Sequence, residues 1–226
     1  MQVIVPAEEA KVRIARRVAR EFDEQKRSMV INLGVGIPTM VAGYIERHDI
    51  YIQAENGMLG VGPLAVGKEV NRQLINAGRQ PVTETPGCCY FDSATSFGMI
   101  RGGHVDATVI GALQVDQEGS IANWIIPNGR QLGVGGAMDL VSGARQVVVA
   151  MQHNTRDGKP KLVKSCTLPI TGFCEADMIV TELAVFHLGG SRLVLKEIAP
   201  EISLDTLVRL TEAEFIVCAN LKTMSV

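Results

Sequence analysis

The segment MVINLGVGIPTMV, residues 29–41, joins a strand signal, a glycine loop and a helix start. Met29–Leu33 is an apolar run and predicts a β-strand. Gly34–Gly36 predicts a tight loop, and Pro38 is typical of the first turn of a helix, where its missing N–H leaves no bond unmade. A strand that passes through a short loop into a helix is the repeating unit of parallel α/β sheets, so this segment sets the expected fold class.

The segments on either side fit the same pattern. Residues 7–22 predict a helix whose acidic residues precede its arginines, as the helix dipole favours. Ile14, Val18 and Phe22 mark its apolar face. Residues 50–54, IYIQA, predict a second strand that ends just before an acidic residue.

The remaining chain continues to alternate strands with helices. Further strands are predicted at residues 105–115, 146–152, 177–186 and 192–198. Further helices are predicted within residues 91–103, where Asp92 is the cap and Gly102–Gly103 the stop, within 133–144 after a glycine loop, and within 203–215 as a closing helix. Residues 184–198 predict a late antiparallel hairpin. We therefore expect an open α/β/α sandwich with a mostly parallel central sheet, as one domain over residues 1–226 without a linker.

Composition narrows the classes of function. The chain has 226 residues, a net charge of -2 and 4% aromatic residues, which argues against nucleic acid and anionic membranes as partners. Five cysteines without a CxxC pair indicate neither a disulfide framework nor a zinc knuckle. The N-terminal apolar run is too short for a signal peptide, and no run approaches a membrane span, so we expect a cytoplasmic protein.

Three glycine-rich motifs are candidate ligand loops: NLGVGIPT at residues 32–39, ENGMLGVGP at 55–63 and GVGGAMDL at 133–140. Glycines let backbone N–H groups approach an oxyanion or a phosphate. The alternative is that these motifs are tight turns needed only for packing. For a single loop we would favour this alternative. Three such motifs together shift the balance toward a binding site, although none fits a nucleotide-binding pattern.

Other chemistries have weaker support. The histidines are scattered without metal-ligand spacing, and we expect no metal site (His48, His104, His153 and His187). No G-x-S-x-G motif indicates a serine hydrolase. Cys88–Cys89 could carry a reactive thiol, but small buried residues at a turn are the favoured interpretation. Asn123–Trp124 could face a ligand, or Trp124 could belong to the core.

Glu55 is the remaining chemical candidate, because residues 53–63 contain no Lys, Arg or His to pair with it. A carboxylate with a pKa near its ordinary value of about 4.3 is ionised at neutral pH and needs no general base to attack an activated acyl carbon. The attack creates an oxyanion, which glycine N–H groups can stabilise. Alternatively, Glu55 accepts hydrogen bonds from its own turn, and the residues alone slightly favour this structural role.

The succession of ENGMLGVGP, NLGVGIPT, INAGRQ, FDSATSFGMIRGGH, ANW and GVGGAMDLVSGA resembles the beta subunit of class I CoA-transferases, from about Arg13 to about Ala213. The resemblance implies that Glu55 becomes a glutamyl-CoA thioester. It implies oxyanion and substrate binding by backbone at Gly34, Val35, Gly36, Gly135, Gly136 and Ala137. It also implies CoA binding by Asn56, Gly57 and Arg79, with coenzyme A as a substrate and no tightly bound cofactor.

The resemblance further implies a separate alpha subunit, in an alpha2beta2 complex, because this chain lacks the GGFG-like loop of that subunit. Two departures from the family pattern bear on substrate preference: Ala54 stands where many relatives have Ser, and PNGRQL stands at residues 127–132. We expect transfer of CoA between short-chain acids of the acetoacetate, acetate, butyrate or succinate class, with ping-pong kinetics. A 3-oxoadipate-type transferase and a non-catalytic acyl-CoA or sugar-phosphate sensor are the alternatives.

Overall fold

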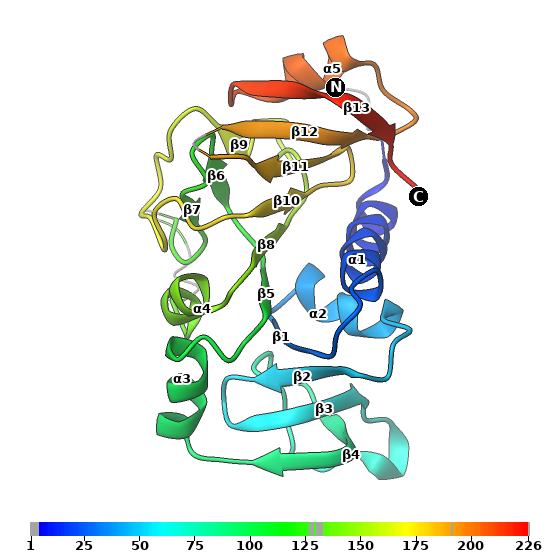
Figure 1. The fold of residues 1–226 in the computed structure, drawn as a ribbon, viewed down its shortest axis with the longest axis vertical. Coiled ribbons are helices and arrows are strands. Elements are labelled where there is room, and N and C mark those ends of the chain that lie inside the picture. The colour runs from blue at the N-terminus through cyan, green and yellow to red at the C-terminus, as the bar shows by residue number, and fades with distance from the viewer. Residues whose placement is uncertain (1–4, 127–128, 130–132, 191, 226) are drawn as a thin grey trace.

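Figure 1 shows the computed structural model, which describes residues 5–126, 129, 133–190 and 192–225. Its helices are α1 (Ala7–Asp23), α2 (Ile37–Val41), α3 (Ser93–Arg101), α4 (Ala137–Gly143) and α5 (Leu204–Leu210), with 3-10 turns η1 (Ala42–Tyr44) and η2 (Gly67–Glu69). Its strands are β1 (Met29–Leu33), β2 (Ile50–Ala54), β3 (Met58–Leu64), β4 (Val82–Tyr90), β5 (Ala107–Ile110), β6 (Gln114–Asp116), β7 (Ile121–Ala122), β8 (Val147–Ala150), β9 (Leu162–Val163), β10 (Met178–Val180), β11 (Ala184–Leu188), β12 (Leu193–Ile198) and β13 (Phe215–Thr223).

The described strands form a large sheet in the order β13-β12-β11-β10-β8-β5-β1-β2-β3-β4 and a small sheet in the order β7-β6-β9. The centre of the large sheet, from β10 through β8, β5 and β1 to β2, is parallel throughout. Antiparallel pairs extend it through β3 and β4 on one side and through β11 and β12 on the other. The expected mostly parallel central sheet and the late hairpin are confirmed.

Apolar layers cover both faces of this sheet. Along β8, Val147 and Val149 belong to one core cluster and Val148 and Ala150 to the other. Helices α1 and α2 lie on one face, whereas α3, α4 and the small sheet lie on the opposite face (Figure 1). A strand buried on both sides must be apolar at every position, which explains why the central strands read as continuous apolar runs.

The segment at residues 29–41 folds as predicted. Strand β1 ends at Leu33, and Pro38 lies in the first turn of α2. The loop between them runs close to β5, where the N–H of Gly34 donates to the carbonyl oxygen of Val109 at 2.9 Å. Any Cβ at Gly34 would lie 3.1 Å from that same oxygen, so the glycine allows the close approach.

Two expected strands are each divided in the structure. Residues 177–186 contain β10 and the start of β11, which reverse direction at Thr181. The Thr181 hydroxyl accepts hydrogen bonds from the N–H groups of Leu183 and Ala184, at 3.2 and 3.0 Å, and so stabilises the reversal. Residues 105–115 likewise separate into β5 and β6, which belong to different sheets.

The prediction of a closing helix within residues 203–215 is wrong in two respects: the helix is shorter, and it is not the last element. Helix α5 ends at Leu210, and Thr211 is already extended. Strand β13 follows and pairs parallel with β12 at the edge of the large sheet. Its side chains are exposed or half-buried, as expected for an edge strand.

Most of the motif ENGMLGVGP is a strand rather than a glycine-rich loop, because residues 58–63 belong to β3 and Gly60 and Gly62 serve its pairing with β4. A Cβ at Gly60 would lie 3.0 Å from the Cα of Cys88, and one at Gly62 would lie 2.9 Å from the carbonyl oxygen of Thr83. The cysteines at 88–89 lie on β4, where Cys89 is exposed, so the expectation of small buried residues at a turn is also wrong.

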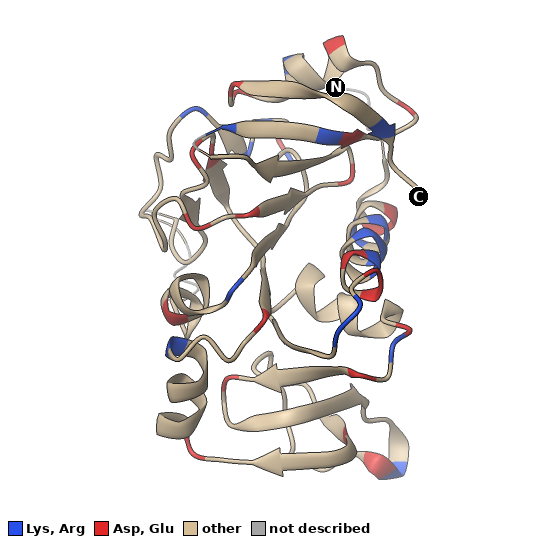
Figure 2. Ribbon diagram, viewed as in Figure 1, with Lys and Arg blue, Asp and Glu red and all other residues tan. Residues whose placement is uncertain are grey.

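Charged residues gather on α1 and on the loops and outer elements (Figure 2). Helix α1 buries two of its arginines, which pair with acids across the fold: Arg13 with Glu201 at 2.7 Å and Arg17 with Glu197 at 2.8 Å. No helix in the described part of the chain has the length and apolar composition needed to cross a membrane.

Candidate active site

Glu55 lies in the tight turn that joins β2 to β3. The N–H of Gly57 closes this turn on the carbonyl oxygen of Ala54 at 3.0 Å, and Gly57 has a φ of +119°. A Cβ at Gly57 would overlap the carbonyl oxygen of Phe91. The glycine is therefore required by the turn itself, which projects Glu55 from the end of a central strand.

A buried chain of hydrogen bonds holds the backbone of Glu55. Asn32 on β1 donates from Nδ2 to Oε1 of Gln53 at 2.6 Å, and Gln53 on β2 donates from Nε2 to Oγ of Ser96 at 2.9 Å. The Ser96 hydroxyl then donates to the carbonyl oxygen of Glu55 at 2.7 Å. These three polar residues are 2%, 1% and 0% exposed, so the network fixes the position of the turn within the apolar core.

The carboxylate of Glu55 packs against the glycines that precede α4. A Cβ at Gly136 would overlap Oε2 of Glu55 and lie 2.9 Å from its Cδ, and one at Gly135 would lie 3.6 Å from Oε1. Only a residue without a side chain lets the carboxylate approach the backbone this closely. The second and third glycine motifs thus meet in space at one acid.

Burial raises the pKa of Glu55 above its ordinary value, the backbone N–H of Gly136 opposes that shift, and the charge of Asp139 adds to it. The expectation of an ordinary pKa is therefore wrong. Asp139 is itself paired with Arg101 at 2.6 Å. A partly desolvated carboxylate with a raised pKa is a stronger base and nucleophile once ionised.

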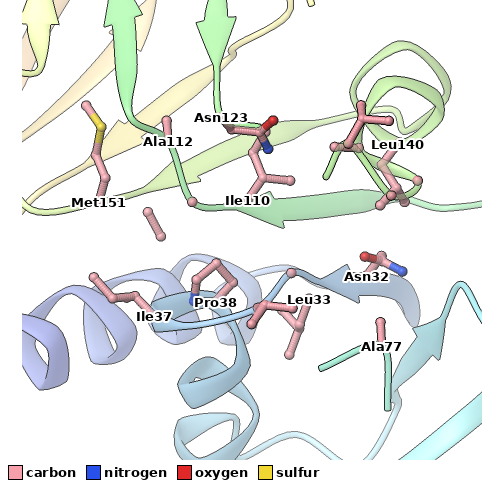
Figure 3. Close-up of a pocket in the computed structure, with 18 of the residues that line it drawn as sticks. Asn32, Leu33, Ile37, Pro38, Ala77, Ile110, Ala112, Asn123, Leu140 and Met151 are labelled. Carbon is pink, nitrogen blue, oxygen red and sulfur yellow. The ribbon is translucent and has the colours of Figure 1, made fainter. Parts of the chain in front are cut away.

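A cavity of about 630 Å³ opens beside Glu55 (Figure 3). Its lining comes from the β1–α2 loop, from the chain after β5 and after β8, and from the loop that leads into α4. Several carboxyl ends of parallel strands meet here, which is where open α/β sheets bind ligands. Figure 3 shows apolar side chains, among them Leu33, Ile37, Pro38 and Ile110, directed toward the space.

Most of the site residues implied by the family resemblance line this cavity: Glu55, Gly34, Val35, Gly135, Gly136, Ala137 and Arg79. The others, Gly36, Asn56 and Gly57, are not among its lining residues. Gly36 precedes α2 with a φ of +95°. Asn56 donates from Nδ2 to the carbonyl oxygen of Ile75 at 2.9 Å, which ties the Glu55 turn to the neighbouring loop.

Arg79 lies at the tip of that loop in a left-handed conformation, with a φ of +62°. The turn is closed by the bond from the N–H of Arg79 to the carbonyl oxygen of Asn76 at 2.9 Å. A left-handed arginine carries a conformational cost that a glycine or asparagine would avoid. Its exposed side chain borders the cavity and provides a cation at the opening.

Sequence reasoning missed the residues that support Glu55 and one cation. Asn32 and Gln53 are register partners across β1 and β2. Each is a polar residue within an otherwise apolar strand, and this break in the apolar run was a usable signal. Ser96 lies inside a capped helix and gave no signal. Lys161 lines the cavity. It follows a polar segment that cannot be told from an exposed loop by its sequence, so it gave no signal.

The competing chemistries have less structural support. The described residues that line the cavity include no cysteine and no histidine. Burial raises the pKa of the Cys88 thiol, which lowers its thiolate fraction. Asn123 lines the cavity as one interpretation predicted. No metal-holding group of three His, Cys, Asp or Glu occurs in the described residues. The departure from the family pattern at residues 127–132 lies outside the described residues, except for Gly129.

Comparison with known proteins points to one family. A sequence model of the family described as Coenzyme A transferase matches residues 11–210. The chain is 49% identical, over 95% of its length and 97% of the relative's, to the acetate CoA-transferase subunit beta of Escherichia coli K12. It is 46% identical to the mitochondrial succinyl-CoA:3-ketoacid coenzyme A transferase 2A of Rattus norvegicus, covering 95% of this chain but 41% of that protein.

The fold is also similar to that of a solved structure, the acyl-CoA transferase apoenzyme of Escherichia coli O157:H7. The TM-score is 0.74 at 22% sequence identity, and the match covers 100% of this chain and 45% of the other. At this identity the likeness concerns the fold alone. It agrees with the α/β/α architecture described above.

Proposed function

The chain belongs to the coenzyme A transferase family, and from that premise we propose that it is the beta subunit of a short-chain 3-oxoacid CoA-transferase with Glu55 as its nucleophile. The observation that carries the proposal is the position of the Glu55 carboxylate, which lies at the edge of the cavity against the backbone of Gly135 and Gly136. A carboxylate with a raised pKa, placed beside backbone donors, suits attack on an acyl carbon.

In the first half-reaction, the ionised Glu55 attacks the carbonyl carbon of an acyl-CoA and releases CoA thiolate, which leaves a mixed anhydride. The thiolate then attacks the Glu55 carbonyl carbon of this anhydride. The products are a glutamyl-CoA thioester and the free carboxylate of the donor acid. Backbone N–H groups near Gly34 and Gly136 are the candidate donors for the oxyanions formed in these steps.

In the second half-reaction, the carboxylate of an acceptor acid attacks the thioester and forms a new anhydride with Glu55. The released thiolate attacks the acceptor's acyl carbon, which yields a new acyl-CoA and regenerates the Glu55 carboxylate. No metal or proton donor is required, because each leaving group departs as a stable anion. We assign the exposed cation of Arg79 to the phosphates of CoA.

The relatives support the substrate class and the partner. The names of the two relatives reported above refer to acetate and to succinyl-CoA with 3-ketoacids, so we assign short-chain acids as substrates. The bacterial relative is named as a beta subunit, and the rat protein is more than twice as long as the matched region. We therefore assign a separate alpha chain as the partner that completes the enzyme.

The decisive experiment is covalent trapping at Glu55. The complex with its alpha chain is incubated with donor acyl-CoA in the absence of an acceptor and then treated with borohydride, which reduces a thioester to an alcohol. Peptide mass spectrometry should find the modification on the peptide that carries ENGMLGVGP. Glu55→Ala should abolish both the adduct and CoA transfer.

The matched control is Glu69→Ala, which removes an exposed acid of the same part of the chain. It should leave both the adduct and CoA transfer intact. Substantial transfer by Glu55→Ala, or an adduct on Cys88 or Cys89, would refute the assigned nucleophile. Binding of acyl-CoA by the complex with Glu55 left unmodified would instead favour a sensor.

A further inference from the structure

Lys161 lies at the start of the small sheet, immediately before β9, and its side chain lines the same cavity as Glu55. Backbone bonds fix its position: its N–H donates to the carbonyl oxygen of His153 at 3.2 Å, and its own carbonyl oxygen accepts from Val115 at 2.9 Å. Within the described part of the chain, its ammonium group forms neither a hydrogen bond nor an ion pair.

The cavity has two chemically different ends. Figure 3 shows Met151 at one end and Leu140 with Asn32 at the other. Glu55 belongs to the Leu140 end, because its carboxylate touches Gly136, the residue before α4. Lys161 belongs to the Met151 end, because its backbone is bonded to the chain two residues beyond Met151.

The wall between these ends is mainly apolar, with the amide of Asn123 as a polar group on it (Figure 3). It is built by Leu33, Ile37, Pro38, Ile110 and Ala112. An acyl chain that reaches from the carbon attacked by Glu55 along this wall therefore passes apolar surface first. Lys161 provides a cation at its far end.

The surroundings of Lys161 leave its charge incompletely balanced. Burial lowers the pKa of Lys161 to about 8, and the acidic Glu182 opposes this. Glu182, in the β10–β11 turn, lies beyond ion-pair distance, and its carboxylate accepts the N–H of His153 at 2.9 Å. Arg13 also acts on Glu182, and the neighbouring His153 is neutral, with a pKa lowered to about 3 by burial.

We propose that the Lys161 ammonium binds an oxygen at the far end of the acyl group, so that the cavity selects short acids with a second oxygen function over saturated acids of equal length. The second oxygen belongs to a 3-oxo group or to a second carboxylate. A desolvated ammonium without a partner gains more from such an oxygen than from a methyl group. This inference rests on the proposed function and names the acids that the same site prefers.

Three acids of four carbons test the proposal, because they differ mainly at the far end: butyrate, acetoacetate and succinate. Each is offered as CoA acceptor to the complex with its alpha chain, using one donor acyl-CoA. The variant Lys161→Met removes the charge at similar length, and Lys161→Arg keeps it. The measured quantity is the ratio of kcat/KM for each oxygen-bearing acid to that for butyrate.

We expect Lys161→Met to lower these ratios by about ten- to a hundredfold, as the loss of a charged hydrogen bond would. Lys161→Arg should retain most of the preference. A fall for succinate alone identifies a carboxylate as the bound group, whereas a fall for acetoacetate alone identifies the 3-oxo oxygen. Equal losses for all three acids, or unchanged ratios, would overturn the proposal.

The pH dependence of the unmodified protein provides a second arm that does not depend on a variant folding. The preference over butyrate should decline as pH rises above about 8, where Lys161 loses its proton, since kcat/KM reports groups of the free enzyme. In Lys161→Arg the decline should disappear. If no acid accepts CoA and no Glu55 adduct forms, the proposed function fails; if transfer proceeds with a pH-independent preference, only the role of Lys161 fails.

Discussion

Gly62 on β3 and Gly136 before α4 belong to motifs that look alike in the sequence, yet the structure requires them for different reasons. A Cβ at Gly62 would lie 2.9 Å from the carbonyl oxygen of Thr83 and 3.0 Å from its carbonyl carbon. A Cβ at Gly136 would meet the carboxylate of Glu55 and lie 3.2 Å from Cζ of Phe97. Neither glycine has a positive φ, so the neighbouring atoms alone make the difference.

The comparison separates a packing glycine from a glycine of the site. The backbone of a paired strand cannot retreat without breaking its hydrogen bonds, so an added methyl group at Gly62 strains the sheet. A carboxylate at the end of a flexible side chain can turn away, so a methyl group at Gly136 displaces the nucleophile instead. The first change should cost stability, and the second should cost activity.

The largest effect is expected from Gly136→Ala, which should lower kcat by about a hundredfold or more, because a shift of roughly 1 Å in a reacting group has that effect. The melting temperature should change little, since the displaced group is a side-chain end. Steady-state kinetics and thermal unfolding of the alpha–beta complex measure both. A normal kcat with a lowered melting temperature would mean that Gly136 is needed for packing and not for the position of Glu55.

Gly62→Ala should show the opposite pattern. Overpacking against Thr83 should destabilise the fold by about 2 kcal/mol, which lowers the melting temperature of a chain of this length by roughly 5 °C. The kcat per folded molecule should stay near that of the unmodified protein. Loss of turnover at an unchanged melting temperature would contradict the assignment of Gly62 to packing.

Ser96→Ala sharpens the comparison by acting on the backbone of Glu55 rather than on its side chain. Without the hydroxyl, the carbonyl oxygen of Glu55 and the amide of Gln53 lose their shared partner, and we expect kcat to fall about tenfold with a smaller change in KM. The control is Ser93→Ala, an exposed serine of the same helix. Equal effects of the two variants would rule out a positioning role.

The smallest effect concerns the charge of Asp139, which lies in α4, the helix directly after Gly136. Asp139 raises the pKa of Glu55, so Asp139→Asn should lower that pKa and let activity persist to lower pH, because Glu55 attacks as the anion. The acid limb of kcat/KM against pH measures it. Arg101→Gln breaks the same ion pair but keeps the acid, and an equal shift to lower pH in this variant would refute the explanation.

Local signals were sufficient for much of the fold. The apolar run of β1, the Pro38 helix start and the Asp92 cap, whose carboxylate accepts the N–H of Thr95 at 2.8 Å, depend on neighbours in the chain and were predicted at their observed places. The division of residues 177–186 was missed because it depends on the Thr181 hydroxyl, and β13 was missed because its partner β12 lies elsewhere in the sequence.

Sequence by itself determined the alternation of strands and helices, the acid at residue 55 and the family, because hydrophobic periodicity, turn residues and motifs are properties of the chain's order. Only the tertiary structure decided which glycine touches the acid, that burial raises its pKa, and that Lys161 shares its cavity. These facts depend on which distant segments meet and how much water their meeting excludes. Such distances and burials arise only when the sheet assembles.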